Sequence, residues 1–335
     1  MYWIEFLIST AMIVFAGTRL TVCADKLSDE LNLGKAWIGI ILLGFVTSLP
    51  EAITSLVAIV SLGANDLAIG NLLGSNNINP MIIVVMDALY RRGALTNTVE
   101  PCPSHKTAAS FAILLSCIVI ADIIFTVPAL NFGRLTVSAG GVMIAACYFA
   151  GMRRLARQGA GRSVLAPSRD EAVSKNRPLA GLGAQLLLNA AIVVVGGMWL
   201  ARSADVIAWQ TGLGGTFFGS IFLALVTSLP EVVVSLSAMK IGSLDLALGN
   251  IFGSNMTNMF ILFVCGLFYR GGAILGAVSK AHVVTAALSV LLTFVAVKGV
   301  FTRNKRTVFG LGLDSLIMIV LFFAGTGILY KFRLY

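Results

Sequence analysis

The segment TSLPE decides how this chain is interpreted, because it occurs at residues 47–51 and again at residues 227–231, 180 positions later. Past this motif the offset shortens to 179, and GNLLGSN at residues 70–76 is matched by GNIFGSN at residues 249–255. A repeat of this length, which also keeps rare polar residues in register, indicates an internal duplication rather than an accident of composition.

The composition is typical of a protein embedded in a lipid bilayer. Of the 335 residues, 58% are hydrophobic and 12% are charged, and the mean hydropathy is +0.93, whereas soluble domains carry about 25% charged residues. Apolar runs such as residues 112–125 lack the alternation of β-barrel strands, which excludes a barrel. A membrane-spanning helix needs roughly 20 mostly apolar residues. We expect ten such helices, near residues 3–22, 36–62, 66–88, 107–126, 133–152, 181–201, 216–240, 244–268, 281–299 and 309–330.

The duplication and the expected spans together predict the domain organisation. The first repeat covers residues 1–152, a basic linker covers residues 153–178, and the second repeat covers residues 179–335. Five spans per repeat is an odd number, so the second repeat enters the membrane upside down, as in many secondary transporters. The predicted fold is therefore an all-α membrane protein with ten transmembrane helices arranged as two inverted five-helix repeats.

The net charge of +9 is distributed in a way that predicts membrane topology. Most Lys and Arg residues fall in loops and helix ends on the linker's side, so the positive-inside rule places the linker in the cytoplasm and both termini outside. Anionic lipid is the expected partner of the basic linker, and no pattern typical of nucleic-acid binding is visible. With its short linker, the chain resembles prokaryotic inner or plasma membrane proteins, and that location is the expected one. The oligomeric state is left open.

Two carboxylates stand apart from the others, most of which lie in loops or near helix ends. Glu51 and Glu231 fall near the middle of their expected spans, at matched positions of the two repeats. A charged side chain at the centre of a bilayer costs about 2.5–3.5 kcal/mol on insertion scales. A bound cation or proton would compensate that charge, so we expect these glutamates to form the core of an ion site.

Oxygen-bearing residues surround each glutamate in the sequence. The threonine four residues earlier shares its helix face, and a serine follows that threonine: Thr47 and Ser48 in the first repeat, Thr227 and Ser228 in the second. A proline before each glutamate lacks an N–H and bends its helix. Carboxylate, hydroxyl and carbonyl oxygens suit Ca²⁺, Na⁺ or Mg²⁺, whereas Zn²⁺ and Cu⁺ prefer nitrogen or sulfur.

A polar stripe on the next span of each repeat provides the opposite wall of this predicted site. Its members, spaced at i, i+4 and i+8, are Asn71, Ser75 and Asn79 in the first repeat and Asn250, Ser254 and Asn258 in the second. Glycines four residues apart, such as Gly249 and Gly253, favour close helix packing on the same spans. We expect the glycines to bring the helices together and the polar stripe to line the ion path.

With these motifs, the chain resembles the calcium/cation antiporter superfamily, which includes sodium/calcium exchangers and cation/proton exchangers. The resemblance covers nearly the whole chain and implies ten helices, with alternating access by sliding of the first and sixth. It also implies a set of cation ligands. In this chain they are the side chains of Thr47, Ser48, Glu51, Ser75, Asn79, Thr227, Ser228, Glu231, Ser254 and Asn258, with the backbone carbonyls of Gly44 and Ala224.

The chain departs from that family at the residue that ends each polar stripe. Sodium/calcium exchangers often carry an aspartate at one of the positions held here by Asn79 and Asn258, so this site has two carboxylates rather than three. Two negative charges balance one Ca²⁺, and we therefore expect an electroneutral exchange of one Ca²⁺ for two monovalent ions.

The resemblance implies a secondary active transporter that exchanges Ca²⁺ for Na⁺, and not an enzyme. A Ca²⁺/H⁺ antiporter or an exchanger of another cation is the alternative, and a membrane enzyme or channel is a third hypothesis from a different class. No Walker motif suggests a nucleotide, and the five cysteines lack metal-binding spacing. His105 and His282, expected at the surface, form no HExxH zinc motif. No cofactor is expected beyond the transported ions, Ca²⁺ and Na⁺ or H⁺.

Overall fold

Backbone groups inside lipid must be hydrogen-bonded within the chain, which favours helices, and helices dominate this protein. The computed structural model describes residues 2–90, 94–125, 129–132, 135–162, 179–210, 223–302, 307–308 and 310–332. Within these ranges eight helical segments are long and apolar enough to cross a membrane. They are Tyr2–Glu30, Lys35–Val60, Asn65–Leu89, Pro103–Phe125, Ala180–Ile207, Leu244–Phe268, Ala281–Thr302 and Leu313–Lys331. The chain is an integral, multi-pass membrane protein.

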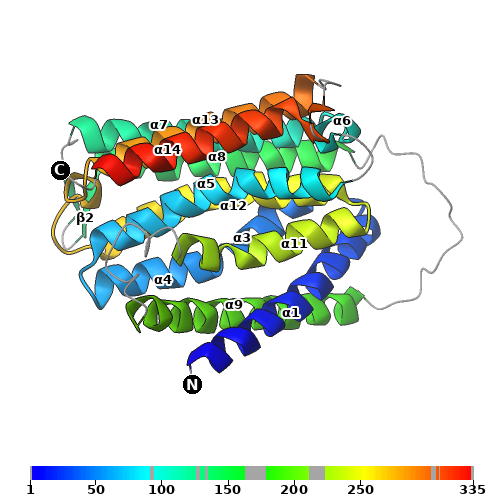
Figure 1. Ribbon diagram of the computed structural model, residues 1–335, viewed down its shortest axis with the longest axis horizontal. Helices are drawn as coiled ribbons and strands as arrows, with labels where there is room; N and C mark the ends of the chain where they lie inside the picture. Colours follow the sequence, from blue (N-terminus) through cyan, green and yellow to red (C-terminus); the bar gives the residue numbers. More distant parts are fainter. Residues whose placement is uncertain are drawn as a thin grey trace, which may run out of the picture.

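Where both halves of the chain are described, they build a similar succession of elements (Figure 1). The first half contains α1 (Tyr2–Glu30), α2 (Lys35–Ile38), the π-helix η1 (Gly39–Leu43), α3 (Gly44–Thr47), α4 (Leu49–Val60), α5 (Asn65–Leu89), α6 (Leu95–Thr98), α7 (Pro103–Phe125), β1 (Ala129–Phe132), β2 (Leu135–Ser138) and α8 (Ala139–Arg162). The second half contains α9 (Leu179–Gln210), α11 (Leu229–Lys240), α12 (Leu244–Phe268), the 3-10 helix η2 (Ile274–Gly276), α13 (Ala281–Thr302), β3 (Thr307–Val308), β4 (Leu311–Gly312) and α14 (Leu313–Phe332).

The predicted all-α fold class is confirmed, and two short antiparallel strand pairs accompany the helices. β1 pairs antiparallel with β2 and joins α7 to α8, and β3 pairs antiparallel with β4 and joins α13 to α14. The expected span 133–152 therefore begins too early, because residues 135–138 form a strand and the helix starts at Ala139. A short apolar run does not by its periodicity distinguish a strand from the first turn of a helix.

Two of the ten expected spans are not among the eight. α8 is a continuous helix, but Arg153, Arg154 and Arg157 follow its apolar part closely. Residues 216–222 of the expected span 216–240 lie outside the described residues. From residue 223 this span is helical up to a break before α11. Residues 163–178 of the expected linker also lie outside the described residues.

α5 and α12, the helices that carry the two polar stripes, lie side by side in the middle of the molecule (Figure 1). α1 and α9 pack along each other on one side, next to α4 and α11. α7, α8, α13 and α14 cover the opposite side. The polar stripes are therefore enclosed on both sides by helices from both halves of the chain.

Glycines let α12 of the second half approach the backbone of the first half. A Cβ atom on Gly253 would overlap the carbonyl group of Ile40, and one on Gly44 would lie 2.8 Å from the backbone nitrogen of Ser254. Side chains at these positions would push the helices apart, so the contact depends on small residues on both partners. The glycines do bring helices together, as expected from their spacing, and the helices that they join belong to different halves.

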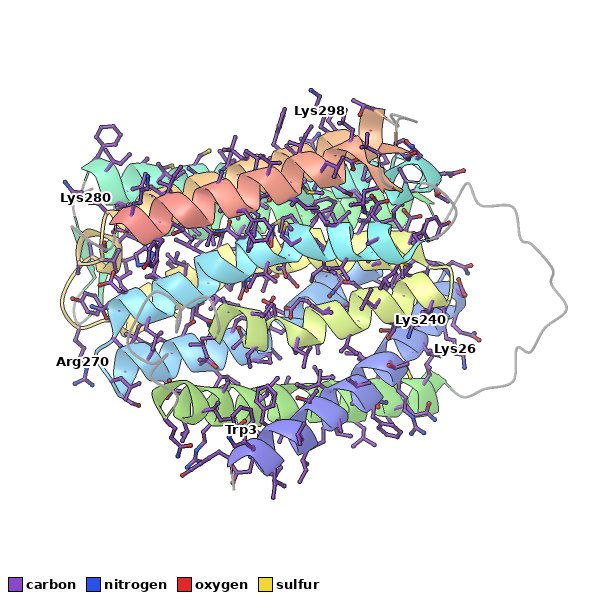
Figure 2. The ribbon with its side chains drawn as sticks, viewed as in Figure 1. Trp3, Lys26, Lys240, Arg270, Lys280 and Lys298 are labelled. Atoms are coloured by element: carbon purple, nitrogen blue, oxygen red, sulfur yellow. The ribbon has the colours of Figure 1, made fainter. Side chains whose placement is uncertain are left out.

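Basic side chains mark the two ends of the helices. In Figure 2, Lys26 and Lys240 lie at the right-hand end with Lys298 toward it, whereas Arg270 and Lys280 lie at the left-hand end. In the expected spans the first group lies at or after the ends of odd-numbered spans, and the second group lies between the eighth and ninth spans, so the two groups are expected on opposite sides of the membrane. α1 begins and α14 ends toward the left-hand side (Figure 1). Which end faces the cytoplasm stays a prediction of the positive-inside rule.

We expect the substitution Gly253→Leu to destabilise the protein, because its side chain would overlap the backbone of Ile40 and overpacking costs about 1–3 kcal/mol or more. The melting temperature of the purified protein in detergent, followed by size-exclusion chromatography after heating, measures this effect. Gly183→Ala is the matched control, because a Cβ atom there meets nothing within 4 Å. Equal melting temperatures for the two variants would contradict the backbone contact.

Candidate functional site

Two interrupted helices position the functional side chains. The helix of the first half breaks at Ser48 (φ −83°, ψ 0°), two residues before Pro50. In the second half, Ser228 (φ −80°, ψ 5°) stands in the same relation to Pro230. Proline suits the first turn of a helix but not its interior, so each proline starts a new helix, α4 or α11. The bends that the sequence predicts are therefore breaks, each located at a serine.

Crossed hydrogen bonds link the two glutamates, which are both fully buried. Ser228 Oγ donates to Glu51 Oε1 at 3.4 Å, and Ser48 Oγ donates to Glu231 Oε1 at 3.5 Å. Each carboxyl group is thus held by a serine from the other half. Two carboxylates in one apolar site cannot both stay ionised unless a positive charge compensates them.

Each threonine of the repeated motif contacts the polar stripe of the opposite half. Thr47 Oγ1 donates to Asn250 Oδ1 at 3.2 Å and lies 3.2 Å from Ser254 Oγ. Thr227 Oγ1 donates to Asn71 Oδ1 at 3.0 Å. All five side chains are buried. The site is therefore a joint product of the two halves, and neither half could form it alone.

The two backbone carbonyls implied as ligands differ in their surroundings. The carbonyl of Gly44 accepts a hydrogen bond from Ser254 Oγ at 3.3 Å, and the same hydroxyl lies 3.4 Å from Glu231 Oε1. The carbonyl of Ala224 accepts a hydrogen bond within its own helix, from Ser228 N at 3.1 Å, and Thr227 Oγ1 lies 3.3 Å from it. The structure thus brings the Gly44 carbonyl against residues of the other half.

Five oxygen atoms of the predicted ligands are buried without a hydrogen-bond partner in the part of the chain that the structure describes. They are Glu51 Oε2, Glu231 Oε2, Ser75 Oγ, Asn79 Oδ1 and Asn258 Oδ1. A buried polar group left unpaired costs about 1–3 kcal/mol, so each of these five atoms would be stabilised by a bound ion within its reach. Oxygen atoms alone are the ligands that Ca²⁺ and similar hard cations prefer.

Two serines at matched positions, Ser55 and Ser235, bind the stripe asparagines, although the sequence analysis assigned these serines no role. Asn71 Nδ2 donates to Ser55 Oγ at 3.1 Å, and Asn250 Nδ2 donates to Ser235 Oγ at 3.0 Å. The 180-residue offset and the spacing of four from each glutamate are the signals that could have identified both serines. Asn76 and Asn255 are another matched pair without an assigned role, and they lie at the 179-residue offset of the repeat. Because Asn71 and Asn250 are bonded at both ends of their amides, they support the wall of the site.

The histidines lie at the two ends of the molecule, each beside an aspartate of the other half. His282 Nε2 lies 3.0 Å from Asp66 Oδ1, and His105 Nε2 lies 3.1 Å from the backbone oxygen of Asp245. His105 is fully buried, so its expected position at the surface is wrong. The start of α12 covers the start of α7, and this contact between halves leaves no trace in the local sequence.

A duplicated helical membrane fold around a buried set of oxygen atoms defines a class of protein, the secondary transporters built from repeats. The sequence profile of the sodium/calcium exchanger protein family matches residues 1–150 and 182–331. The chain belongs to this family, within the calcium/cation antiporter superfamily that its motifs resemble.

Relatives agree with this assignment. The chain is 25% identical over 302 residues to the putative antiporter CaxA of Alkalimonas amylolytica, which covers 90% of this chain and 91% of that protein. It is 27% identical over 263 residues to the inner membrane protein YrbG of Escherichia coli, with 76% of each chain covered. Its fold matches the sodium-calcium exchanger NCX_Mj soaked with 100 mM Na⁺ and 10 mM Sr²⁺, with a TM-score of 0.70 and 19% identity over 97% of each chain. The prediction of a transporter rather than an enzyme is confirmed.

We expect Thr47→Val to lower the stability of the protein by about 1–3 kcal/mol, because the buried oxygen of Asn250 loses its hydrogen bond. Thermal unfolding of the purified protein measures the change. Thr302→Val is the control: this hydroxyl is exposed at the end of α13, and its loss should change stability by less than about 0.5 kcal/mol. If Thr47→Val unfolds at the same temperature as the control, the contact between halves does not stabilise the fold.

Proposed function

We propose that the protein is a secondary active antiporter that exchanges Ca²⁺ for Na⁺ across the membrane by alternating access, with the ions bound at Glu51 and Glu231. The observation that supports this most directly is the set of buried, unpaired oxygen atoms around the two glutamates. A Ca²⁺ ion takes six to eight oxygen ligands, and one cation between the halves would give these atoms a shared partner and neutralise both carboxylates.

The proposed ligands fall into three chemical groups. Glu51 and Glu231 supply the negative charge. Neutral oxygens come from the hydroxyl and amide side chains of Thr47, Ser48, Ser75, Asn79, Thr227, Ser228, Ser254 and Asn258. The backbone carbonyls of Gly44 and Ala224 complete the set. Several of the hydroxyls now bond across the site, and they can rotate their hydrogens away and turn a lone pair to a cation.

Alternating access is supported by the way α1 and α9 contact the broken helices. At matched positions of the two repeats, a Cβ atom on Gly17 would lie 3.0 Å from Val233 Cγ1, and one on Gly197 would overlap the ring of Pro50. Small residues thus stand where each long helix crosses the helix that carries a glutamate. Small residues at these crossings would allow the α1–α9 pair to slide relative to the site, with exchange of contacts such as that of Thr21 Oγ1 with the Val234 carbonyl, and such sliding would open the site to either side in turn.

The charge of the site favours electroneutral exchange. No group of three or more His, Cys, Asp and Glu side chains occurs among the residues with described positions, so the glutamates provide the charge with neutral oxygens around them. One Ca²⁺ would then leave in exchange for two Na⁺. Two H⁺, one on each glutamate, would satisfy the same balance, and the neutral Asn79 and Asn258 keep the Ca²⁺/H⁺ antiporter as the second candidate.

The proposed topology has both termini outside and the basic linker at residues 153–178 in the cytoplasm, between inverted five-helix repeats at residues 1–152 and 179–335. The division of labelled Lys and Arg side chains between the two ends of the helices in Figure 2 supports it. A prokaryotic inner membrane is the proposed location, in line with the name of the relative from Escherichia coli.

The coupling ion can be determined by uptake of ⁴⁵Ca²⁺ into proteoliposomes that contain the purified protein. An outward Na⁺ gradient and an outward H⁺ gradient are imposed in turn. We expect uptake with the Na⁺ gradient. Uptake with the H⁺ gradient alone would identify the protein as a Ca²⁺/H⁺ antiporter, and uptake with neither would remove Ca²⁺ as the substrate.

The variant Glu51→Gln should abolish ⁴⁵Ca²⁺ uptake while the protein still inserts and stays monodisperse, because half of the site's negative charge is lost. Glu30→Gln, at an exposed position at the end of α1, is the control and should transport normally. Exchange at the normal rate by Glu51→Gln would refute the assigned site.

The variant Asn258→Asp should make transport electrogenic or change the coupled ion, because it adds a third negative charge to the site. The response of ⁴⁵Ca²⁺ uptake to an imposed membrane potential, set with K⁺ and valinomycin, measures this. The unaltered protein should show no voltage dependence. A voltage response that is the same in both proteins would contradict the charge argument.

A further inference from the structure

Four fully buried asparagines hydrogen-bond to one another where α5 and α12 meet, and Asn255 Nδ2 also donates to Thr293 Oγ1 of α13 at 3.2 Å. Asn76 Nδ2 donates to the backbone carbonyl of Asn255 at 3.1 Å, and Asn255 Nδ2 donates to the backbone carbonyl of Asn76 at 3.3 Å. Asn79 and Asn258, two of the proposed ligands, are the other members. The group follows the symmetry of the repeat, because both pairs are 179 residues apart.

The direction of each amide follows from its neighbours. A backbone carbonyl can only accept a hydrogen bond, so Asn255 must present its NH₂ group to Asn76. Its Oδ1 atom therefore faces the other way, where it accepts a hydrogen bond from Asn79 Nδ2 at 2.9 Å. Asn79 in turn must direct its own Oδ1 atom away from Asn255, and that oxygen is one of the five buried atoms without a partner.

The same chain of bonds runs in the opposite direction. Asn76 is fixed by the carbonyl of Asn255, and its Oδ1 atom accepts a hydrogen bond from Asn258 Nδ2 at 3.0 Å. Asn258 Oδ1 is thereby left without a partner. Each ligand is thus oriented by an asparagine from the opposite half, and each chain of bonds ends on a backbone carbonyl, which cannot reverse.

We propose that Asn76 and Asn255 are positioning residues that lock the amides of Asn258 and Asn79 with oxygen, and not nitrogen, toward the transported cation. This inference rests on the proposed function. A reversed amide would direct N–H groups at the cation and remove an oxygen from its coordination. Hard cations such as Ca²⁺ need many oxygen ligands, so the lock keeps two neutral ligands available in a site with only two carboxylates.

A purely structural role for these asparagines makes a different prediction. Polar side chains that bond between membrane helices stabilise packing whatever ligand they adjoin. A positioning residue affects cation binding only if the amide that it orients could otherwise turn its nitrogen toward the cation. Replacing Asn79 by aspartate removes this choice, since a carboxylate carries oxygen at both ends. The effect of losing Asn255 should therefore depend on which residue occupies position 79.

The test uses the half-saturating Ca²⁺ concentration for ⁴⁵Ca²⁺ uptake by the full chain in proteoliposomes. Asn255→Ala should raise it about 10- to 100-fold, the usual effect of removing a residue that orients a metal ligand. Asn77→Ala is the matched control. Asn77 is the next residue after Asn76, is buried, and donates to the backbone oxygen of Thr285 outside the group. Its loss should change the half-saturating concentration less than about threefold.

A double variant separates positioning from packing. In the Asn79→Asp background, Asn255→Ala should change the half-saturating concentration less than about threefold, because no amide is left to orient. An equal loss in both backgrounds would overturn the proposal. If Asn255→Ala does not fold, the mirrored pair Asn76→Ala and Asn258→Asp gives the same comparison.

The outcomes also distinguish this inference from the proposed function. Absence of Ca²⁺ uptake by the unaltered protein under either gradient would reject the function and the positioning role together. Uptake that requires Glu51, with Asn255→Ala indistinguishable from Asn77→Ala, would leave the function standing and reject the positioning role alone.

Discussion

The structure depends on one constraint: two carboxyl groups from opposite halves of the chain share a site that water does not reach. Glu51 and Glu231 are fully buried, and charged groups in a membrane interior are costly unless they are paired or bind an ion. The residues nearby reduce the cost of burying these carboxyl groups. The helix breaks at Ser48 and Ser228 place a hydroxyl against each carboxyl group, and the surrounding unpaired atoms are oxygens rather than basic nitrogens. A Lys or Arg in their place would neutralise the glutamates permanently, whereas under the proposed function the oxygens leave neutralisation to an ion that can depart.

Duplication explains how such a site is built without a dedicated domain. Each half supplies one glutamate, one broken helix and one polar stripe, but the contacts run between halves: Thr47 bonds to Asn250, and Thr227 bonds to Asn71. The glycines of α12 also contact the other half, since Gly253 packs on the backbone of Ile40. A half that lacked its partner would expose unpaired polar groups to lipid, so assembly of the two halves and formation of the site are one event.

The residues of the candidate site can be predicted from the sequence more readily than the contacts between them. Glu51 and Glu231 stand out because a polar residue in an apolar span is rare, and the repeat doubles the signal. The fold class follows from the same apolar spans. Partner choice is not accessible in this way, because spacing along one helix fixes its polar face but not the helix that covers it. The β-hairpins were missed because strands of two to four residues are too short for their alternation to be recognised. The burial of His105 was missed because α12 of the other half covers it.

The site combines chemical symmetry with conformational asymmetry. The two halves place the same residue types around their glutamates, including Asn79 and Asn258 at the ends of the stripes. Their contacts nevertheless differ, because the Gly44 carbonyl accepts a hydrogen bond from Ser254 Oγ of the other half, whereas the matching Ala224 carbonyl accepts one from Ser228 N of its own helix. If equal sequences adopt unequal arrangements, exchanging the two arrangements gives a second state built from the same types of contact. If the repeats are inverted as proposed, that second state opens on the opposite face of the membrane, and two states of similar energy are both populated. Under the proposed function, the duplication therefore supplies both the two-carboxylate site and the near-equal states between which it must switch.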